Sequence, residues 1–358
     1  MKKAYLVLAN GKVFEGKRFG ADSAATGELV FTTGVVGYLE NLTDPNYYGQ
    51  IVLQTFPLIG NYGVIEEDIP ETATVAGYVV REWCDTPSNF RAQYDLDKYL
   101  KDQGIPGICG IDTREVTRTI RENGVMAAMI CDEIPADLSA LASFEIKGAA
   151  AAVTPDESAT LPAAGEELCR VTLLNFGSCA HIAGALMAEG ATVTVLPFTA
   201  TADEVLATAP DGIVLSEGPG DPSENTVAIE TVKALFGKAP IFGIGMGHQI
   251  LALAMGGKCE KLHHGHRGGN QPVKDMMGTR TYMTTQNHGY TVVADSVKAT
   301  EIYRNVNDGS CEGLCYYPAV PAQSVQFTPV YGNGPHDTSF LYTNFVNTVI
   351  NSKKAGEC

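Results

Sequence analysis

Four short apolar runs alternate with segments of helical periodicity in the second half of the chain, and this alternation most constrains its fold. The runs are nearly continuous, and they lie at 171–176, 192–198, 212–216 and 240–244. Strands that are apolar on both faces are typical of a parallel sheet covered by helices on both sides. The pattern therefore predicts an α/β domain whose chemistry lies beyond the carboxyl ends of the strands.

The first part of the chain has a different rhythm. Up to about residue 140 it carries short runs rich in Val, Thr, Tyr and Phe, such as 29–38, 50–56 and 73–80. These compositions are typical of strands separated by turns. Helical patterns end at Gly104 and run over 113–123, where Gly124 supplies the stop.

The length of 358 residues is enough for two domains. The expected fold class is α/β, with an N-terminal domain of short strands and helices over 1–140. A second domain over 169–358 has a largely parallel sheet covered by helices. Between them, residues 141–168 are rich in Ala, Pro and acidic side chains, which predicts a connection that is partly helical or mobile.

Composition excludes some partners. The formal net charge is −16, which argues against nucleic-acid or anionic-membrane partners, because both need a basic surface. No apolar run approaches the ~18 residues of a membrane span. The N-terminal segment predicts a strand that turns at Asn10-Gly11 rather than a signal peptide. Nine cysteines without any C-x-x-C pair indicate free thiols, and hence a cytoplasmic location.

A strand-to-helix turn with alternating glycines is the strongest candidate for chemistry. The fourth apolar run ends at Ile244, and Gly243, Gly245 and Gly247 alternate before a helical pattern. Such a turn points backbone N–H groups at an anion or a developing oxyanion. A dinucleotide-binding fingerprint does not fit, because His248 stands where its last glycine is required. A nucleophile elbow would have its nucleophile at Gly245, which has no side chain.

A second glycine turn, 217–222, follows the third apolar run. Because neighbouring parallel strands end at the same edge of a sheet, the two turns are expected to line one crevice. The alternative is that both turns serve packing without chemistry.

Motifs along nearly the whole chain carry a resemblance to a known family. GIGMGHQILALA (243–254) and LSEGPGDP (215–222) resemble the elbow and its neighbouring turn in class I glutamine amidotransferases. Further motifs are similar to those of the carbamoyl-phosphate synthetase small subunit. They lie at 27–38, 42–47, 57–61, 88–91, 111–124, 265–275, 285–290 and 334–337.

The resemblance implies an N-terminal domain joined to an amidotransferase domain. It also implies a role in carbamoyl phosphate synthesis for the arginine and pyrimidine pathways. In that family the small subunit hydrolyses glutamine with a Cys-His-Glu triad, and the ammonia passes through a tunnel to a large chain. The large chain, which uses bicarbonate and two ATP, is the implied partner. This chain lacks a phosphate-binding GxxxxGK[ST] loop, so no cofactor is expected on it, and ATP and magnesium are expected on the large chain.

The resemblance places other residues at the three triad positions. Gly245 stands at the nucleophile position, and Thr328 and Val330 stand where the family has His and Glu. Glycine cannot attack and valine cannot orient a base. The chain is therefore interpreted as a glutaminase-inactive, natural paralogue.

Much of the substrate-holding pattern remains. By resemblance, the residues around glutamine are Asn46, Gly218, Gly220, the N–H of Met246, Gln249, Asn287, Gly289 and Tyr290. The equal alternative is that they are kept for turns and packing. Nearby positions differ from the family, which has Ser at Asn46, Asn at Glu217 and DFGxKRNI at 175–182. The negative charge added by Glu217 is expected to weaken binding of a substrate carboxylate.

Two clusters of potential metal ligands occur in the sequence. His263, His264 and His266 lack an accompanying Cys or acidic motif of suitable spacing, so they are interpreted as a solvated loop. Cys311 and Cys315 lie in a strand-like segment and are interpreted as core thiols. No metal site is expected.

Two further features have an alternative role. Cys179 opens a helix and is a conceivable substitute nucleophile, but His181 does not face it, because residues two apart on a helix point in different directions. Asp112, Arg114, Arg118 and Arg121 form either a charged helix face or part of a subunit contact.

Three functions follow from these observations. The leading hypothesis is a structural or regulatory subunit of a carbamoyl-phosphate synthetase. The second is a glutamine or amino-acid sensor without catalysis. The third is a glutaminase with displaced catalytic groups.

Overall fold

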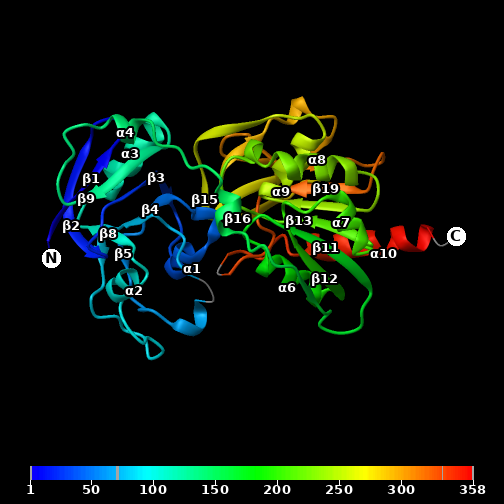
Figure 1. Cartoon of the computed structure of the whole chain (residues 1–358), viewed down its shortest axis with the longest axis horizontal. Helices are drawn as coiled ribbons and strands as arrows, with labels where there is room; N and C mark the ends of the chain where they lie inside the picture. Colours follow the sequence, from blue (N-terminus) through cyan, green and yellow to red (C-terminus); the bar gives the residue numbers. More distant parts are fainter. Residues whose placement is uncertain (1, 70–71, 333, 357–358) are drawn as a thin grey trace. The chain divides into compact units, whose positions relative to one another are not determined.

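The computed structural model describes residues 2–69, 72–332 and 334–356, and Figure 1 shows its course. The chain forms two compact units. The first unit comprises Met1–Lys147 and His263–Gly268, and the second comprises Gly148–Leu262 and Gly269–Cys358. Among the described residues, no helix has both the length and the apolar character needed to cross a membrane.

The first unit is built on a closed barrel with strand order β1-β2-β8-β6-β4-β3-β9. The strands are β1 (Lys3–Leu8), β2 (Val13–Gly20), β3 (Ala25–Thr32), β4 (Gln50–Gln54), β6 (Gly77–Val79), β8 (Pro106–Cys109) and β9 (Met126–Cys131); β5 (Leu58–Ile59) pairs with β7 (Glu82–Trp83). The expected turn between β1 and β2 is confirmed, with Gly11 at φ 86°. Leu6, Ile51 and Ile130 are fully buried in one of the cores.

Short α-helices accompany the barrel. They are α1 (Tyr38–Thr43), α2 (Leu96–Asp102), α3 (Thr113–Asn123) and α4 (Ser139–Ala142). Helix α3 has the predicted bounds, because Asp112 caps its start by accepting from the Glu115 N–H and Gly124 ends it at φ 84°. Val116 and Ile120 on its inner face are buried against the barrel.

The second unit contains a ten-stranded sheet of order β10-β12-β11-β13-β14-β19-β18-β17-β15-β16. Its strands are β10 (Ala159–Leu161), β11 (Cys169–Asn175), β12 (Ala191–Pro197), β13 (Gly212–Leu215), β14 (Ile241–Ile244), β15 (Cys259–Asp275), β16 (Thr281–Val292), β17 (Thr300–Asn305), β18 (Cys311–Cys315) and β19 (Ala322–Val325). Strands β12, β11, β13 and β14 are parallel, as the apolar runs predicted, and β19 adds a further parallel strand beside β14. The remaining pairings of the sheet shown by the register are antiparallel.

Helices cover both faces of this sheet. Buried side chains of α7 (Ala202–Ala207), α8 (Thr226–Leu235) and α9 (Met246–Ala254) share one core, and those of α6 (Ala180–Ala188) and α10 (Phe340–Gly356) share the other. Successive side chains of β11 therefore point into different cores, because Leu174 belongs to the first core and Leu173 to the second. The mixed α/β fold class is confirmed.

The segment expected as a connection, 141–168, contains more regular structure than composition indicated. The change from the first unit to the second falls after Lys147. Beyond it, α5 (Ala149–Val153) and β10 already belong to the second unit. Strand β10 forms because its backbone pairs with β12, where Thr160 lies opposite Thr194.

The interpretation of His263, His264 and His266 as a solvated loop is wrong. All three lie on β15, and His266 is buried. The Val125 N–H donates to the His263 carbonyl over 2.8 Å, and the His264 ring packs against Phe31. Tertiary pairing, rather than an apolar pattern, makes this segment a strand.

Candidate functional site

The two glycine turns lie side by side at the carboxyl ends of β13 and β14. These strands are parallel neighbours, with Leu215 opposite Gly243. The Gly247 N–H donates to the Ser216 carbonyl over 2.9 Å. The structure therefore brings the turns together as the alternation of strands predicted.

Gly245 has a backbone conformation that favours glycine. Its φ is 56° and its ψ is −112°, in the region where side chains are strained. Its N–H donates to the Val325 carbonyl over 2.9 Å, and its carbonyl accepts from the His248 N–H over 3.1 Å. These bonds fix the turn between strand and helix.

The Glu217 side chain packs directly over Gly245. A Cβ atom built on Gly245 would lie 2.9 Å from the Glu217 Cγ and 3.3 Å from its Cβ. Real Cβ atoms essentially never approach a carbon this closely, so a side chain at position 245 requires Glu217 to move. The Glu217 side chain, which follows β13, thus fills the space next to the Gly245 turn.

Residues from distant parts of the chain hold the Glu217 carboxylate. The Thr328 hydroxyl donates to its Oε1, and the His181 Nε2 lies 3.8 Å from its Oε2. Beyond His181, the Tyr331 ring meets the imidazole edge-on at 5.2 Å. Burial and then the Glu217 charge raise the pKa of the Tyr342 phenol well above its ordinary value. The sequence pointed to Glu217 and His181 separately, but it did not predict that the Glu217 carboxylate lies beside Thr328 and His181.

Burial lowers the pKa of His181 to about 4. Its imidazole is therefore neutral near pH 7, and its approach to Glu217 is not an ion pair at that pH. The centre of the site holds one buried carboxylate, one hydroxyl that donates to it, and one neutral imidazole. Cys179 precedes α6 as its cap residue and is half-buried.

Thr328 and Val330 are fixed by structural contacts. The Thr328 N–H donates to the Thr285 carbonyl over 3.0 Å. Val330 packs against the core shared by α6 and α10. Neither side chain carries a group that can take a proton at neutral pH.

The expected glutamine-binding residues are divided between the units. Gly218 and Gly220 lie in the 217–222 turn, and Met246 and Gln249 lie at the start of α9. Strand β16 carries the remaining second-unit candidates, which are Asn287, Gly289 and Tyr290. Asn46 belongs to the first unit, in the 3-10 helix Pro45–Tyr47, where its N–H donates to the Asp44 side chain.

Gln249 is engaged within the protein. Its Nε2 donates to the Tyr290 carbonyl over 2.9 Å and to the Gln326 Oε1 over 3.0 Å. An amide nitrogen carries two hydrogens, so both are used in tying α9 to β16 and to the segment after β19. This contact supports the packing role of Gln249.

Close approach of neighbouring atoms explains the glycines of the 217–222 turn. A Cβ on Gly218 would lie 2.2 Å from the Phe176 carbonyl oxygen. Gly220 has φ 93°, and a Cβ there would lie 2.9 Å from the Ala149 Cβ. Both positions require glycine for the fold alone.

Of the two cysteines expected in the core, Cys311 is buried on β18, and burial raises its pKa to about 12. Cys315, at the end of the same strand, is half-buried.

We expect stability to fall in acid because of a buried histidine next to the turn. His248 is fully buried with its Nδ1 2.8 Å from the Ser324 Oγ, and burial lowers its pKa to about 3. An unfolded histidine binds a proton below about pH 6.5, whereas folded His248 does not. Unfolding therefore becomes easier as the pH falls from 6.5 towards 3, by about 1.4 kcal/mol per pH unit.

Urea denaturation at pH 7.5 and 5.5 measures this loss. His248→Gln is expected to remove about 1.4 kcal/mol of the difference between the two pH values, whatever its stability at pH 7.5. An unchanged pH difference in H248Q would contradict the neutral, buried assignment.

Comparison with known proteins identifies the family. The family model "Carbamoyl-phosphate synthase small chain, CPSase domain" matches residues 6–130, and "Glutamine amidotransferase class-I" matches residues 172–348. A carbamoyl phosphate synthase small chain of Bacillus caldolyticus is 43% identical over 99% of this chain and 99% of its own length. The chain belongs to the carbamoyl-phosphate synthase small-chain family.

Other small chains match equally fully. That of Fusobacterium nucleatum is 43% identical over 99% of this chain and 100% of its own, and the pyrimidine-specific small chain of Bacillus subtilis is 43% identical over 99% and 98%. The two glycine turns lie within the region matched by the amidotransferase model. The carbamoyl-phosphate synthase small-chain resemblance expected from the motifs is thus confirmed.

Proposed function

We propose that this chain is a carbamoyl-phosphate synthase small chain that does not hydrolyse glutamine and that serves the large chain as a structural or regulatory subunit. The observation that supports the proposal is the strand-to-helix turn at Gly245, which has no side chain and is covered by Glu217. By resemblance, this is the family's nucleophile position. Thr328 and Val330 then stand at the positions of the base and its orienting carboxylate.

The chemistry of the residues present supports the same proposal. Amide hydrolysis by this mechanism needs a nucleophile, a base that takes its proton and an orienting group. The Thr328 hydroxyl already donates to Glu217, and Val330 is apolar. His181, neutral near pH 7, has its Nε2 3.8 Å from the carboxylate rather than within hydrogen-bond reach. None of these contacts assembles a nucleophile with its base.

The partner in this proposal is the carbamoyl-phosphate synthase large chain, which carries ATP and magnesium. The complex makes carbamoyl phosphate for the pyrimidine or arginine pathway, with free ammonia as its nitrogen source. The acidic surface, at net charge −16, supports the expectation that neither nucleic acid nor an anionic membrane is a partner.

Ammonia release from glutamine tests the proposal. The purified chain is assayed alone and with the large chain, and the pyrimidine-specific small chain of Bacillus subtilis is assayed in parallel for comparison. We expect no chain-dependent ammonia from glutamine in either sample, but carbamoyl phosphate formation when free ammonia is supplied to the complex. Glutamine-dependent ammonia release that disappears in Cys179→Ala would overturn the proposal in favour of displaced catalytic groups.

The second candidate is a glutamine-binding sensor. The two adjacent glycine turns favour it, because helix α9 begins directly after Gly245 and its N-terminus suits a carboxylate. The negative charge of Glu217 and the use of both Gln249 amide hydrogens oppose it. Calorimetric titration decides between the two, since a sensor releases or absorbs heat with millimolar glutamine and the subunit does not.

A further inference from the structure

Arg267 is a buried arginine of the first unit. It lies on the part of β15 that belongs to that unit, and it is only 3% exposed. The Thr33 N–H donates to the Arg267 carbonyl over 3.3 Å, and the Thr33 hydroxyl donates to the same oxygen over 3.3 Å. These bonds hold Arg267 against the segment that follows β3.

The Arg267 guanidinium has few partners within the protein. Among the residues that the structure describes, it forms no ion pair and donates one hydrogen bond, from Nη1 to the His264 carbonyl over 3.0 Å. Its Nε–H is buried and has no acceptor there. Because Nε and Nη2 point along the same edge of the guanidinium, this edge is the one that remains for a ligand.

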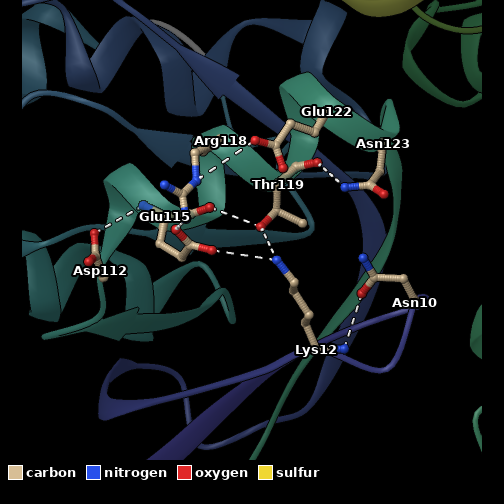
Figure 2. A network of polar contacts seen from close by, with 8 residues as sticks. All are labelled: Asn10, Lys12, Asp112, Glu115, Arg118, Thr119, Glu122 and Asn123. Carbon is tan, nitrogen blue, oxygen red and sulfur yellow. Dashed lines mark hydrogen bonds and ion pairs between the residues drawn. The ribbon is translucent and has the colours of Figure 1, made fainter.

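Other arginines of the same unit have the partner that Arg267 lacks. Arg18, which is 4% exposed, pairs through its Nε with Asp132 over 2.7 Å. Even the exposed Arg118 on α3 pairs with Glu115 (Figure 2). A buried guanidinium without such a partner is costly, because no opposite charge offsets the loss of its hydration.

The groups that act on Arg267 are not counter-ions. Burial raises the pKa of the Tyr47 phenol, although the Arg267 charge lowers it, so Tyr47 is neutral near pH 7 and its hydroxyl is a donor. Burial lowers the pKa of Arg267, and Tyr47 and then Glu28 act against this shift without reversing it. The Glu28 carboxylate accepts from the Gln50 side chain over 3.4 Å. The positive charge of Arg267 is therefore not offset by a paired carboxylate in the described chain.

Further donors lie at the same ends of the barrel strands. Thr32 and Gln54 are opposite each other in the last positions of the parallel strands β3 and β4, and the Thr32 side chain contacts the Tyr47 phenol. The Gln54 Nε2 and the Tyr78 hydroxyl are buried without a hydrogen-bond partner. The carboxyl ends of parallel strands are where ligands bind in α/β folds. These strand ends thus combine one buried positive charge with donors that have no acceptor.

We propose that Arg267, at the carboxyl ends of β3 and β4, binds a small planar oxyanion, either a carboxylate or bicarbonate. Two coplanar oxygens match the parallel N–H groups of Nε and Nη2 in a bidentate pair. The bound charge offsets that of the buried guanidinium, and Tyr47 is a neutral donor near it. The site is formed by the first unit alone, and it does not depend on the proposed function.

Calorimetric titration of the full chain tests the site. Sodium formate and sodium bicarbonate are the planar probes, sodium phosphate is the tetrahedral comparison, and sodium chloride holds the ionic strength constant. Arg267→Lys keeps the charge but loses the planar fork, and Arg267→Met removes both. Arg118→Met is the matched control, because it removes an exposed guanidinium that is already paired.

We expect the unmodified chain and R118M to bind formate, bicarbonate or both, with dissociation constants that agree within about twofold. R267K should bind at least about 10-fold more weakly, as for the loss of one charged hydrogen bond, and R267M should not bind measurably. Tighter binding of phosphate than of both planar probes would overturn the planar class. Absence of planar-anion binding to the unmodified chain, or binding that survives in R267M, would overturn the site.

Thermal melting separates a ligand site from a purely structural role of Arg267. Without formate or bicarbonate, R267M should melt at or above the temperature of the unmodified chain, because methionine replaces an unpaired buried charge. Saturating planar anion should raise the melting temperature of the unmodified chain and leave that of R267M unchanged. If R267M instead melts lower by the same amount with and without the anion, the guanidinium is a structural group and the proposal is wrong.

Discussion

We expect glutaminase activity to appear only when four substitutions are combined, and Gly245→Cys alone to give an inactive, less stable protein. A Cβ at position 245 would lie 2.9 Å from the Glu217 Cγ, at a φ of 56°. The contact and the backbone strain together cost about 2–4 kcal/mol. The new thiol would also lack a base, because position 328 is Thr and position 330 is Val.

The full variant combines Gly245→Cys, Thr328→His and Val330→Glu with Glu217→Asn. The fourth change removes the carboxylate and its bond to position 328. The Asn side chain still has a Cγ, but without that bond it is free to rotate away from the thiol. We expect ammonia release from glutamine to rise at least about 10³-fold over G245C alone, since triad members act as a unit. Steady-state ammonia assays with the large chain present measure this gain.

Two matched variants make the result specific. T328H/V330E/E217N, without the cysteine, should stay at background. G245C/T328H/V330E, with Glu217 retained, should be less stable and less active than the full variant. Full activity in this triple variant would contradict the role of Glu217 as the obstacle, and activity in G245C alone would contradict the triad assignment.

Local signals predicted much of the fold. The bounds of α3 were predictable because a capping Asp and a terminal Gly mark both ends. The parallel strands were predictable from unbroken apolar runs. Strand β15 at His263–Gly268 was not, because its sequence HHGHRG has no apolar alternation and its pairing depends on partners distant in the sequence.

The candidate site was likewise predictable only in part. Adjacent turns follow from parallel strand order, so the meeting of Gly245 with the 217–222 turn was predictable. The placement of the Glu217 side chain was not, because it depends on Thr328 and His181, which lie far away in the sequence. Side-chain direction at a turn depends on such tertiary contacts, and no local pattern encodes them.

A single added methyl group should separate packing from ligand binding as the reason for the glycine at position 218. A Cβ on Gly218 would lie 2.2 Å from the Phe176 carbonyl oxygen and 2.6 Å from the Phe176 Cβ. Phe176 cannot yield easily, because its N–H donates to the buried Ser216 hydroxyl over 2.9 Å. We therefore expect Gly218→Ala to lower the free energy of unfolding by about 3 kcal/mol.

Gly184→Ala is the matched control for this prediction. Gly184 is exposed within α6, and a Cβ there would meet nothing within 4 Å, so alanine should raise stability by about 0.5–1 kcal/mol. Urea denaturation of both variants, with pulse proteolysis if G218A is too unstable for equilibrium melts, gives the two values. Unchanged stability in G218A would mean that packing does not require this glycine, and glutamine binding would then be the better explanation for its presence.

A large loss of stability in G218A, together with a gain in G184A, would mean that the fold alone explains the glycine of this turn. A turn that resembles the family's turn would then not by itself indicate a working substrate site.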